Sequence, residues 1–206
     1  MDSDNTQILF GFGRIAATLR AGEWQAAGGH GLVPAQAEIL SRIVKAPLRA
    51  ADIAAHLGVS PASASDSTAA LVTKGLARRE PDPADGRARL LTATDVGARV
   101  AQALAAMPTP LAGALDTLSI GDRGGLLRAL TMLIRALQEA RAIPVQRMCA
   151  TCRHFRPNAH PDAAKPHHCT FVNAAFGDAA LRLDCGDHKQ ASAEEATALW
   201  QRFDAA

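Results

Sequence analysis

The sequence predicts a mainly α-helical protein with one small β-hairpin, followed by a small irregular module near the C-terminus. Apolar residues recur at helical spacing through most of residues 6–142. Between Leu76 and Thr92, two short extended segments flank a turn rich in Pro, Asp and Gly, which is the pattern of a β-hairpin. All four cysteines lie between Cys149 and Cys185. We therefore expect two domains, residues 1–143 and 144–206, the second stabilised by a metal ion or a cluster.

The composition is that of an ordinary folded domain with a small appendage. The chain has 206 residues, 48% of them hydrophobic, and a formal net charge of +2. Such a small charge does not by itself indicate a nucleic-acid partner, so any DNA contact must come from the local placement of Arg and Lys. Residues 1–5 are acidic and polar, unlike a secretion signal, and no apolar run approaches the ~20 residues of a membrane span. We expect a cytoplasmic protein with no membrane association.

The first part of the chain predicts four helices with recognisable ends. Pro34 stands at the first turn of the second helix, and Gly58 closes a short third helix. The fourth helix begins with Ser60 as a hydroxyl cap and Pro61 in its first turn, and it ends at Gly75. The expected spans are residues 6–25, 34–46, 51–57 and 61–74.

Further helices are expected on the C-terminal side of the hairpin. Asp122 is the expected cap of a long amphipathic helix, and Pro144 ends that helix and marks the domain boundary. Ser192 and Glu195 form the pattern of a capping box, which predicts a last helix. The expected spans are residues 94–107, 111–118 (a short helix or turn), 122–143 and 192–203.

The order helix, glycine-containing turn, capped helix and hairpin is the layout of a winged helix-turn-helix. Ala54 is small where the two helices cross, Gly58 makes the turn, and Val59 packs beneath it. In such a unit the second helix lies in the major groove of DNA, and the hairpin reaches the backbone or the minor groove. The third and fourth helices are therefore the expected reading unit.

Within this layout the chain resembles the MarR family of transcriptional regulators. The segments Leu57-Gly-Val-Ser-Pro61, Leu71-Val-Thr-Lys-Gly-Leu76 and Arg79-Glu-Pro-Asp-Pro-Ala-Asp-Gly-Arg87 match its pattern in order and spacing. The resemblance extends over about residues 6–142. It implies a homodimer built by the terminal helices, bound to double-stranded DNA at a pseudo-palindromic operator. No catalytic constellation appears in the sequence, and we expect no enzymatic activity.

The resemblance also implies which residues contact DNA. Arg87 would enter the minor groove, with Asp85 orienting it through a charge-assisted hydrogen bond. The other residues expected at the DNA are Ser60, Ser63, Ser65 and Ser67 on the reading helix and Arg89 on the wing. The chain departs from the family at Asp66 and Ala70, where many members carry Arg. Because aspartate near phosphate is unfavourable, the affinity should depend mainly on the wing.

Two readings are open for the aromatic residues of the first helix. Phe10, Phe12 and Trp24 could form the dimer core, or they could line the small-molecule effector crevice that many family members have. The dimer core is the preferred reading, and a small-molecule effector remains an alternative partner.

The cysteines allow a zinc site. Cys149-x-x-Cys152 and Cys185-x-x-His188 both look like zinc knuckles, giving a tetrahedral Cys₃His site without redox activity. This set leaves Cys169 unused, or uses Cys169 and leaves His188 idle. Two disulfides are disfavoured because thiols stay reduced in the cytoplasm.

An iron–sulfur cluster uses all four thiolates. The order Cys149-x₂-Cys152-x₁₆-Cys169-x₁₅-Cys185 resembles the ligand layout of high-potential iron–sulfur proteins, which implies a 4Fe–4S cluster. An aromatic residue usually precedes the last cysteine there, whereas Asp184 does so here. Nearby cations would offset the negative charge of cluster and thiolates: Arg147, Arg153, Arg156, Lys165 and Arg182.

The preferred functional hypothesis combines the winged helix-turn-helix domain with the cysteine-rich module. It is a sequence-specific DNA-binding regulator that senses redox state, oxygen species or iron through a Cys₄-ligated cluster. One alternative is a small-molecule-responsive repressor of the same family with a structural zinc site. An alternative from another class is an electron-transfer protein that contains a winged domain.

Overall fold

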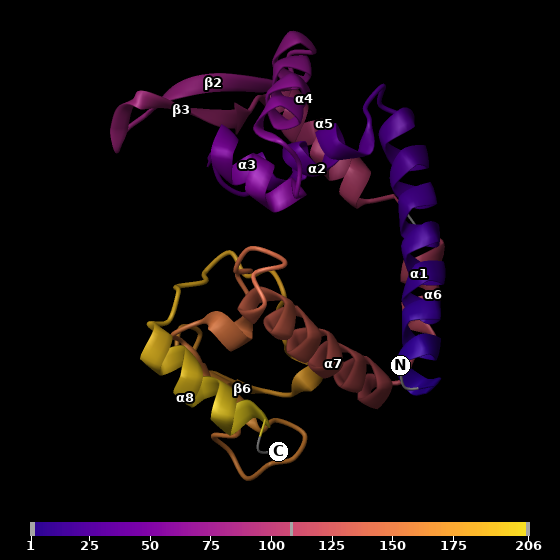
Figure 1. The fold of residues 1–206 in the computed structure, drawn as a ribbon, viewed down its shortest axis with the longest axis vertical. Coiled ribbons are helices and arrows are strands. Elements are labelled where there is room, and N and C mark those ends of the chain that lie inside the picture. The colour runs from indigo at the N-terminus through magenta and orange to yellow at the C-terminus, as the bar shows by residue number, and fades with distance from the viewer. Residues whose placement is uncertain (1–2, 108, 205–206) are drawn as a thin grey trace. The chain divides into compact units, whose positions relative to one another are not determined.

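The computed structural model describes residues 3–107 and 109–204 and contains two compact units, Met1–Ala114 and Leu115–Ala206 (Figure 1). The sequence placed the boundary at residues 143/144. The division lies earlier because the long helix α7 (Ile120–Glu139) packs against the cysteine-rich residues and shares their core through Leu127.

The first unit is a bundle of short helices around one core. It contains α1 (Ser3–Gly28), α2 (Pro34–Ile43), α3 (Ala50–Leu57), α4 (Pro61–Thr73) and α5 (Asp95–Ala105), and α6 (Pro110–Asp116) spans the division. Each predicted helix is present, and α1 is longer than expected because its two alanines before Gly28 continue it. The core is formed by fully buried side chains, among them Ile39, Leu40, Ile53 and Leu71.

A three-stranded antiparallel sheet completes this unit. Its strands β1 (Leu48–Arg49), β2 (Ala77–Asp82) and β3 (Asp85–Ala93) follow the order β1-β3-β2. The hairpin of β2 and β3 projects beyond α3 and α4 as a wing (Figure 1). Its base is held by buried Leu91, and the register shifts between Pro81 and Asp82 near the tip. The predicted hairpin is therefore present, with longer strands and a shorter turn.

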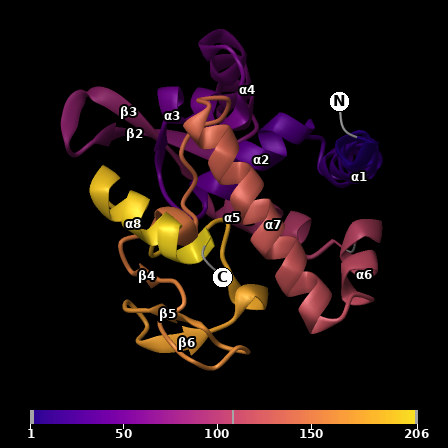
Figure 2. The ribbon, with the colours of Figure 1, turned by 60° about the horizontal axis from the view of Figure 1, so that its bottom comes forward.

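The second unit contains more regular structure than expected. Its small antiparallel sheet, in the order β4-β5-β6, consists of β4 (Phe155–Arg156), β5 (His167–Cys169) and β6 (Ala174–Phe176). The 3₁₀ turns η1 (Cys149–Thr151) and η2 (Asp178–Ala180) and the helix α8 (Ala193–Asp204) complete it. Figure 2 shows this sheet and α8 on one side of α7. Cys152, Phe155, Leu181 and Phe203 form the buried core.

The helix ends confirm one predicted cap and correct another. Ser192 and Glu195 form the predicted capping box, with reciprocal bonds of 3.2 Å (Glu195 N–H to Ser192 Oγ) and 2.8 Å (Ser192 N–H to Glu195 Oε2). The cap of α7 is Ser119 and not Asp122, because the Ser119 hydroxyl oxygen accepts the Asp122 N–H at 3.1 Å. The helix ends at Glu139, before Pro144, where Arg141 adopts a left-handed backbone with φ of 57°.

No helix in residues 3–107 and 109–204 is long and apolar enough to cross a membrane.

Candidate nucleic-acid interface and candidate metal centre

The reading helix α4 is positioned by a tight turn and a side-chain cap. Gly58 adopts the left-handed conformation (φ 63°) that this turn requires. The Ser60 hydroxyl oxygen accepts the Ser63 N–H at 3.2 Å and lies 3.0 Å from the Ser63 hydroxyl. The two predicted DNA contacts nearest the helix start therefore also hold the cap, which leaves them less free to rotate toward DNA.

The exposed face of α4 is centred on Asp66. Ala64, Thr68 and Leu71 are buried, so the opposite side of the helix faces outward. At 3.6 residues per turn, Ser63 and Ser67 lie on one flank of that outer face and Ser65 on the other. Ser67 is half-buried, whereas Ser60, Ser63 and Ser65 are exposed. The four serines thus border the outer face, and the carboxylate of Asp66 occupies its middle.

The wing presents two exposed arginines, Arg87 and Arg89. The Asp85 carboxylate accepts the backbone N–H of Arg87 at 3.1 Å. The predicted contact with the guanidinium is not formed, because the tight hairpin tip brings the Arg87 backbone to the carboxylate. Among the described residues the guanidinium has no hydrogen-bond partner, so all its donors remain available to an external acceptor.

A groove of about 360 Å³ lies between α4 and the wing. Ser65 and Thr68 line it from α4, and Arg79 and Arg89 line it from the strands. The Arg79 Nη2 donates to Thr68 Oγ1 at 3.4 Å, which aims a further cation along the groove. Arg79 was not among the predicted DNA contacts, although its register opposite buried Leu91 indicates which side of the sheet it occupies.

An ion pair fastens the wing to the base of α3. The Arg49 Nε donates to Asp82 Oδ2 at 2.7 Å, and the Ala84 N–H donates to Asp82 Oδ1 at 2.8 Å. The Ala84 N–H, followed by the Arg49 guanidinium, lowers the pKa of the Asp82 carboxyl despite its burial. This pair joins residues 33 positions apart, which no local pattern in the sequence indicates.

The four cysteines line one cavity of about 160 Å³ in the second unit. Cys149 begins η1 and Cys152 follows it, Cys169 ends β5, and Cys185 lies in the loop before α8. All four are free thiols, so neither of the two disfavoured disulfides is formed. The rest of the lining is largely apolar: Phe155, Phe171, Val172, Ala174, Phe176 and Ala180.

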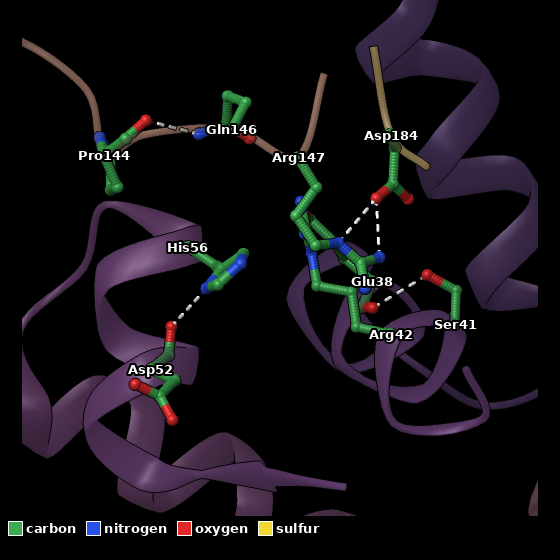
Figure 3. Close-up of polar contacts among 9 residues, drawn as sticks. All are labelled: Glu38, Ser41, Arg42, Asp52, His56, Pro144, Gln146, Arg147 and Asp184. Carbon is green, nitrogen blue, oxygen red and sulfur yellow. Dashed lines mark hydrogen bonds and ion pairs between the residues drawn. The ribbon is translucent and has the colours of Figure 1, made fainter. Parts of the chain in front are cut away.

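Backbone hydrogen bonds hold the cysteine loops together. The Cys149 N–H donates to the Arg182 carbonyl at 2.9 Å, and the Cys185 N–H donates to the Arg147 carbonyl at 2.8 Å. Arg147 also pairs with Asp184, with 2.6 Å between Nη2 and Oδ1 (Figure 3). Segments far apart in the sequence are thereby fixed around the cavity.

The thiol of Cys149 lies in an environment that opposes its negative charge. Burial, together with the neighbouring Cys185, Cys152 and Cys169, raises its pKa to about 11, although the Arg182 N–H donates to its Sγ at 3.4 Å. A bound cation would reverse this balance, because metal coordination stabilises the thiolate.

The geometry does not assemble the predicted Cys₃His set. His188 is absent from the cavity lining, and its Nε2 lies 3.0 Å from Thr151 Oγ1. Thiolates of a tetrahedral zinc site lie about 3.8 Å apart, since each Zn–S bond is about 2.3 Å. In the described part of the chain, no three His, Cys, Asp or Glu side chains gather closely enough to hold a single metal ion. The cysteines surround a larger space.

Comparison with known proteins bears on the first unit. Residues 30–88 match the model of the MarR family. The transcriptional regulator SlyA superimposes with a TM-score of 0.54 at 22% identity, over 65% of this chain and 95% of SlyA. BldR from Sulfolobus solfataricus superimposes with a TM-score of 0.56 at 18% identity, over 66% of this chain and 99% of BldR. The fold is therefore that of these winged helix regulators. No curated protein matches the sequence.

The MarR match ends just after Arg87, so it contains α2, α3, α4 and most of the wing. It includes Asp66 and the Arg49–Asp82 pair, and it excludes every cysteine. The cysteine cavity therefore has to be interpreted from its own geometry.

Proposed function

We propose that this protein is a sequence-specific, DNA-binding transcriptional regulator of the MarR type. The observation that carries the proposal is the match of residues 30–88, which coincides with an exposed reading helix beside a wing. The Arg87 guanidinium supports it, because this group has no hydrogen-bond partner within residues 3–107 and 109–204 and Arg donors bind phosphate and groove edges. Arg79 and Arg89 extend the cationic surface along the groove between α4 and the wing.

Selection from a pool of random duplexes tests this proposal without knowledge of the regulated genes. We expect enrichment of a pseudo-palindrome whose half-sites lie about one helical turn apart, roughly 34–36 Å. Failure to enrich any sequence at low salt would contradict the proposal. A redox-active cluster in a protein without DNA affinity would instead favour the electron-transfer alternative.

We also propose that the regulator is a homodimer. On α1, apolar side chains that normally avoid water are exposed: Ile8, Leu9, Phe10, Phe12, Ile15, Leu19 and Trp24. On α7, the exposed apolar residues are Leu126, Met132, Leu133 and Leu137. Apolar faces of this size usually mark association surfaces, and a second copy offers the same faces in return. Sedimentation measures the expected dimer, and a monomer at micromolar concentration would contradict it.

For the second unit, we propose a 4Fe–4S cluster held by Cys149, Cys152, Cys169 and Cys185. The support is the meeting of all four thiols in one largely apolar cavity, where a cluster needs one thiolate for each iron. When bound, such a cluster supplies one-electron chemistry and sensitivity to oxidants. Iron and sulfide analysis with a visible spectrum of anaerobically purified protein tests this. Stoichiometric zinc without iron would favour the structural-zinc alternative.

The sensing role that we propose needs a route from the cluster to α7. Gly124 lies where η2 crosses the helix, since a Cβ there would be 3.3 Å from Ala179 N and from Asp178 Cβ. One turn later, the Arg128 Nη2 donates to the Phe203 carbonyl at 2.6 Å. Phe203 in turn packs against the cavity residue Phe155, with ring centroids 5.8 Å apart. Redox state, oxygen species or iron supply could thus alter the position of α7.

A small-molecule effector is the second candidate input. A pocket of about 470 Å³ lies among α1, α2 and α5 of the first unit. It is mostly apolar, and Glu23 and Glu38 line it, so it would suit an apolar molecule carrying a positive charge. Phe10, Phe12 and Trp24 do not line it, which favours the dimer reading for these aromatics. If a small molecule is the effector, such a compound should weaken DNA binding in a saturable manner, which a DNA-binding titration at increasing compound concentration measures.

A further inference from the structure

Two hydrogen bonds join Arg182 and Cys149 at the wall of the cysteine cavity. The Cys149 N–H donates to the Arg182 carbonyl at 2.9 Å, and the Arg182 N–H donates to Cys149 Sγ at 3.4 Å. A backbone amide keeps its proton, so the direction of the second bond depends neither on a tautomer nor on a rotating hydroxyl. In the part of the chain that the structure describes, no other cysteine sulfur accepts a hydrogen bond. The four sulfurs are therefore not equivalent.

The Arg182 amide is held in place on both sides. Before it, Leu181 is buried in the core of the second unit, and its N–H closes the turn η2 by donating to the Asp178 carbonyl at 3.0 Å. The turn lies against α7 at Gly124. After it, the Arg182 carbonyl is fixed by the Cys149 N–H. The donor thus points at the sulfur before any group binds, and binding requires no rearrangement of this segment.

We propose that the Arg182 N–H donates a hydrogen bond to the Cys149 thiolate of the bound cluster and thereby raises the reduction potential of that cluster. This inference rests on the proposed cluster. Hydrogen bonds to the sulfurs are among the features that set the potential of an iron–sulfur centre. The donor stabilises the reduced, more negative cluster more than the oxidised one, because the Coulombic attraction grows with the charge on sulfur. The Arg182 amide would then set the oxidant strength to which the proposed regulator responds.

Potentiometric titration of variants at position 182 tests the proposal. Arg182→Pro removes the N–H but keeps the carbonyl that Cys149 uses, and the ψ of 136° at Leu181 suits a residue before proline. Arg182→Ala is the matched control, because it removes the exposed side chain and keeps the amide. Relative to Arg182→Ala, we expect Arg182→Pro to shift the reduction equilibrium about tenfold toward the oxidised form, or about 59 mV for one electron. An ester in place of the amide between residues 181 and 182 of Arg182→Ala should give the same shift without a proline ring.

The ester variant decides where the proline variant fails to fold. A potential equal to that of Arg182→Ala, with full iron content in both, would overturn the proposal even if Arg182→Pro showed a shift. Absence of iron and sulfide from the parent would instead refute the cluster and with it the effect on the potential. The hydrogen bond is then tested by NMR with ¹¹³Cd bound to the cysteines. A scalar coupling between the metal and the Arg182 amide proton supports the bond, and its absence refutes it.

Discussion

At the scale of single residues, the proposed DNA-binding surface combines cations on the wing with an anion on α4. The Arg87 guanidinium at the wing tip has no hydrogen-bond partner in the described part of the chain, whereas Asp66 lies at the centre of the outer face of α4. Phosphate attracts the first and repels the second. The two residues therefore give opposite and separately measurable contributions to affinity.

Replacing Arg87 with Ala should weaken binding to all DNA sequences alike. A wing contact to the backbone or minor groove positions the protein but reads little sequence, and its loss should reduce affinity roughly tenfold. Titration of the selected operator and of a scrambled duplex measures both affinities. Equal binding by variant and parent at physiological salt would refute the wing contact.

Replacing Asp66 with Arg should raise non-specific affinity. The added cation releases counterions from DNA, so the slope of log K against log salt should steepen by about 0.9. Fluorescence anisotropy at several salt concentrations gives this slope. Asp162→Arg makes the same charge change at an exposed position outside the winged unit and should leave the slope nearly unaltered.

Replacing Cys169 with Ser distinguishes the two cofactor readings. The residue is essential to a cluster with four thiolates, yet a zinc site of Cys149, Cys152, Cys185 and His188 does not need it. We expect Cys169→Ser to lose iron and His188→Ala to keep it, because His188 contacts Thr151 outside the cavity lining. Metal analysis decides: full zinc occupancy in Cys169→Ser, with no iron in the parent, would end the cluster hypothesis.

At the scale of elements, the wing is an extended hairpin held at one point by Arg49 and Asp82. Its tip has little core of its own, because only Asp82 is buried between Pro81 and Arg87. The orientation of Arg87 and Arg89 relative to α4 therefore depends largely on this ion pair.

The stabilisation of the wing by the Arg49–Asp82 ion pair should depend on pH. Because the folded pKa of Asp82 is lowered, the pair contributes its full stability above the unfolded value of about 3.9 and loses it as the pH falls through the lower folded pKa. Carboxyl NMR of Asp82, with amide exchange of the hairpin, should show this loosening in acid. The Asp82→Asn variant should show a loose hairpin at all pH values; a pH response equal to that of the parent would contradict the assignment.

The elements also mark the limit of what local sequence patterns predict. Apolar spacing with caps such as Ser60 and Ser192 located the helices, because both signals lie within a few residues. The cysteine spacing predicted a common site, and the four thiols do line one cavity. The sheet β4-β5-β6 was missed, since strands of two or three residues are too short to show alternation. Spacing likewise shows that α7 has an apolar face, but not which partner covers it.

At the scale of the whole molecule, α7 has one apolar side that is buried and another that is exposed. Leu127 and Thr131 pack into the second unit, whereas Leu133 and Leu137 are exposed. A similar exposed face runs along α1, where Phe10 is 63% exposed. In the proposed dimer these faces would be covered by the second copy.

Replacing Phe10 with Glu should therefore shift the protein toward monomers. A charge in a desolvated interface is unfavourable, so the dimer dissociation constant should rise at least roughly tenfold. Arg20→Glu, an exposed charge reversal on the same helix, is the control. Sedimentation equilibrium measures both variants; a Phe10→Glu protein that remains dimeric at nanomolar concentration would place the dimer contact elsewhere.

The small core of the second unit has a consequence for the abundance of the protein. Its main core cluster has few fully buried members, Cys152, Phe155, Leu181 and Phe203, so a bound group would contribute much of its stability by mass action. Loss of that group would raise the population of opened chains, which cellular proteases cleave. If the bound group is the proposed cluster, a cell short of iron would lose the proposed regulator through faster turnover, and transcription would respond to its depletion as well as to its altered shape.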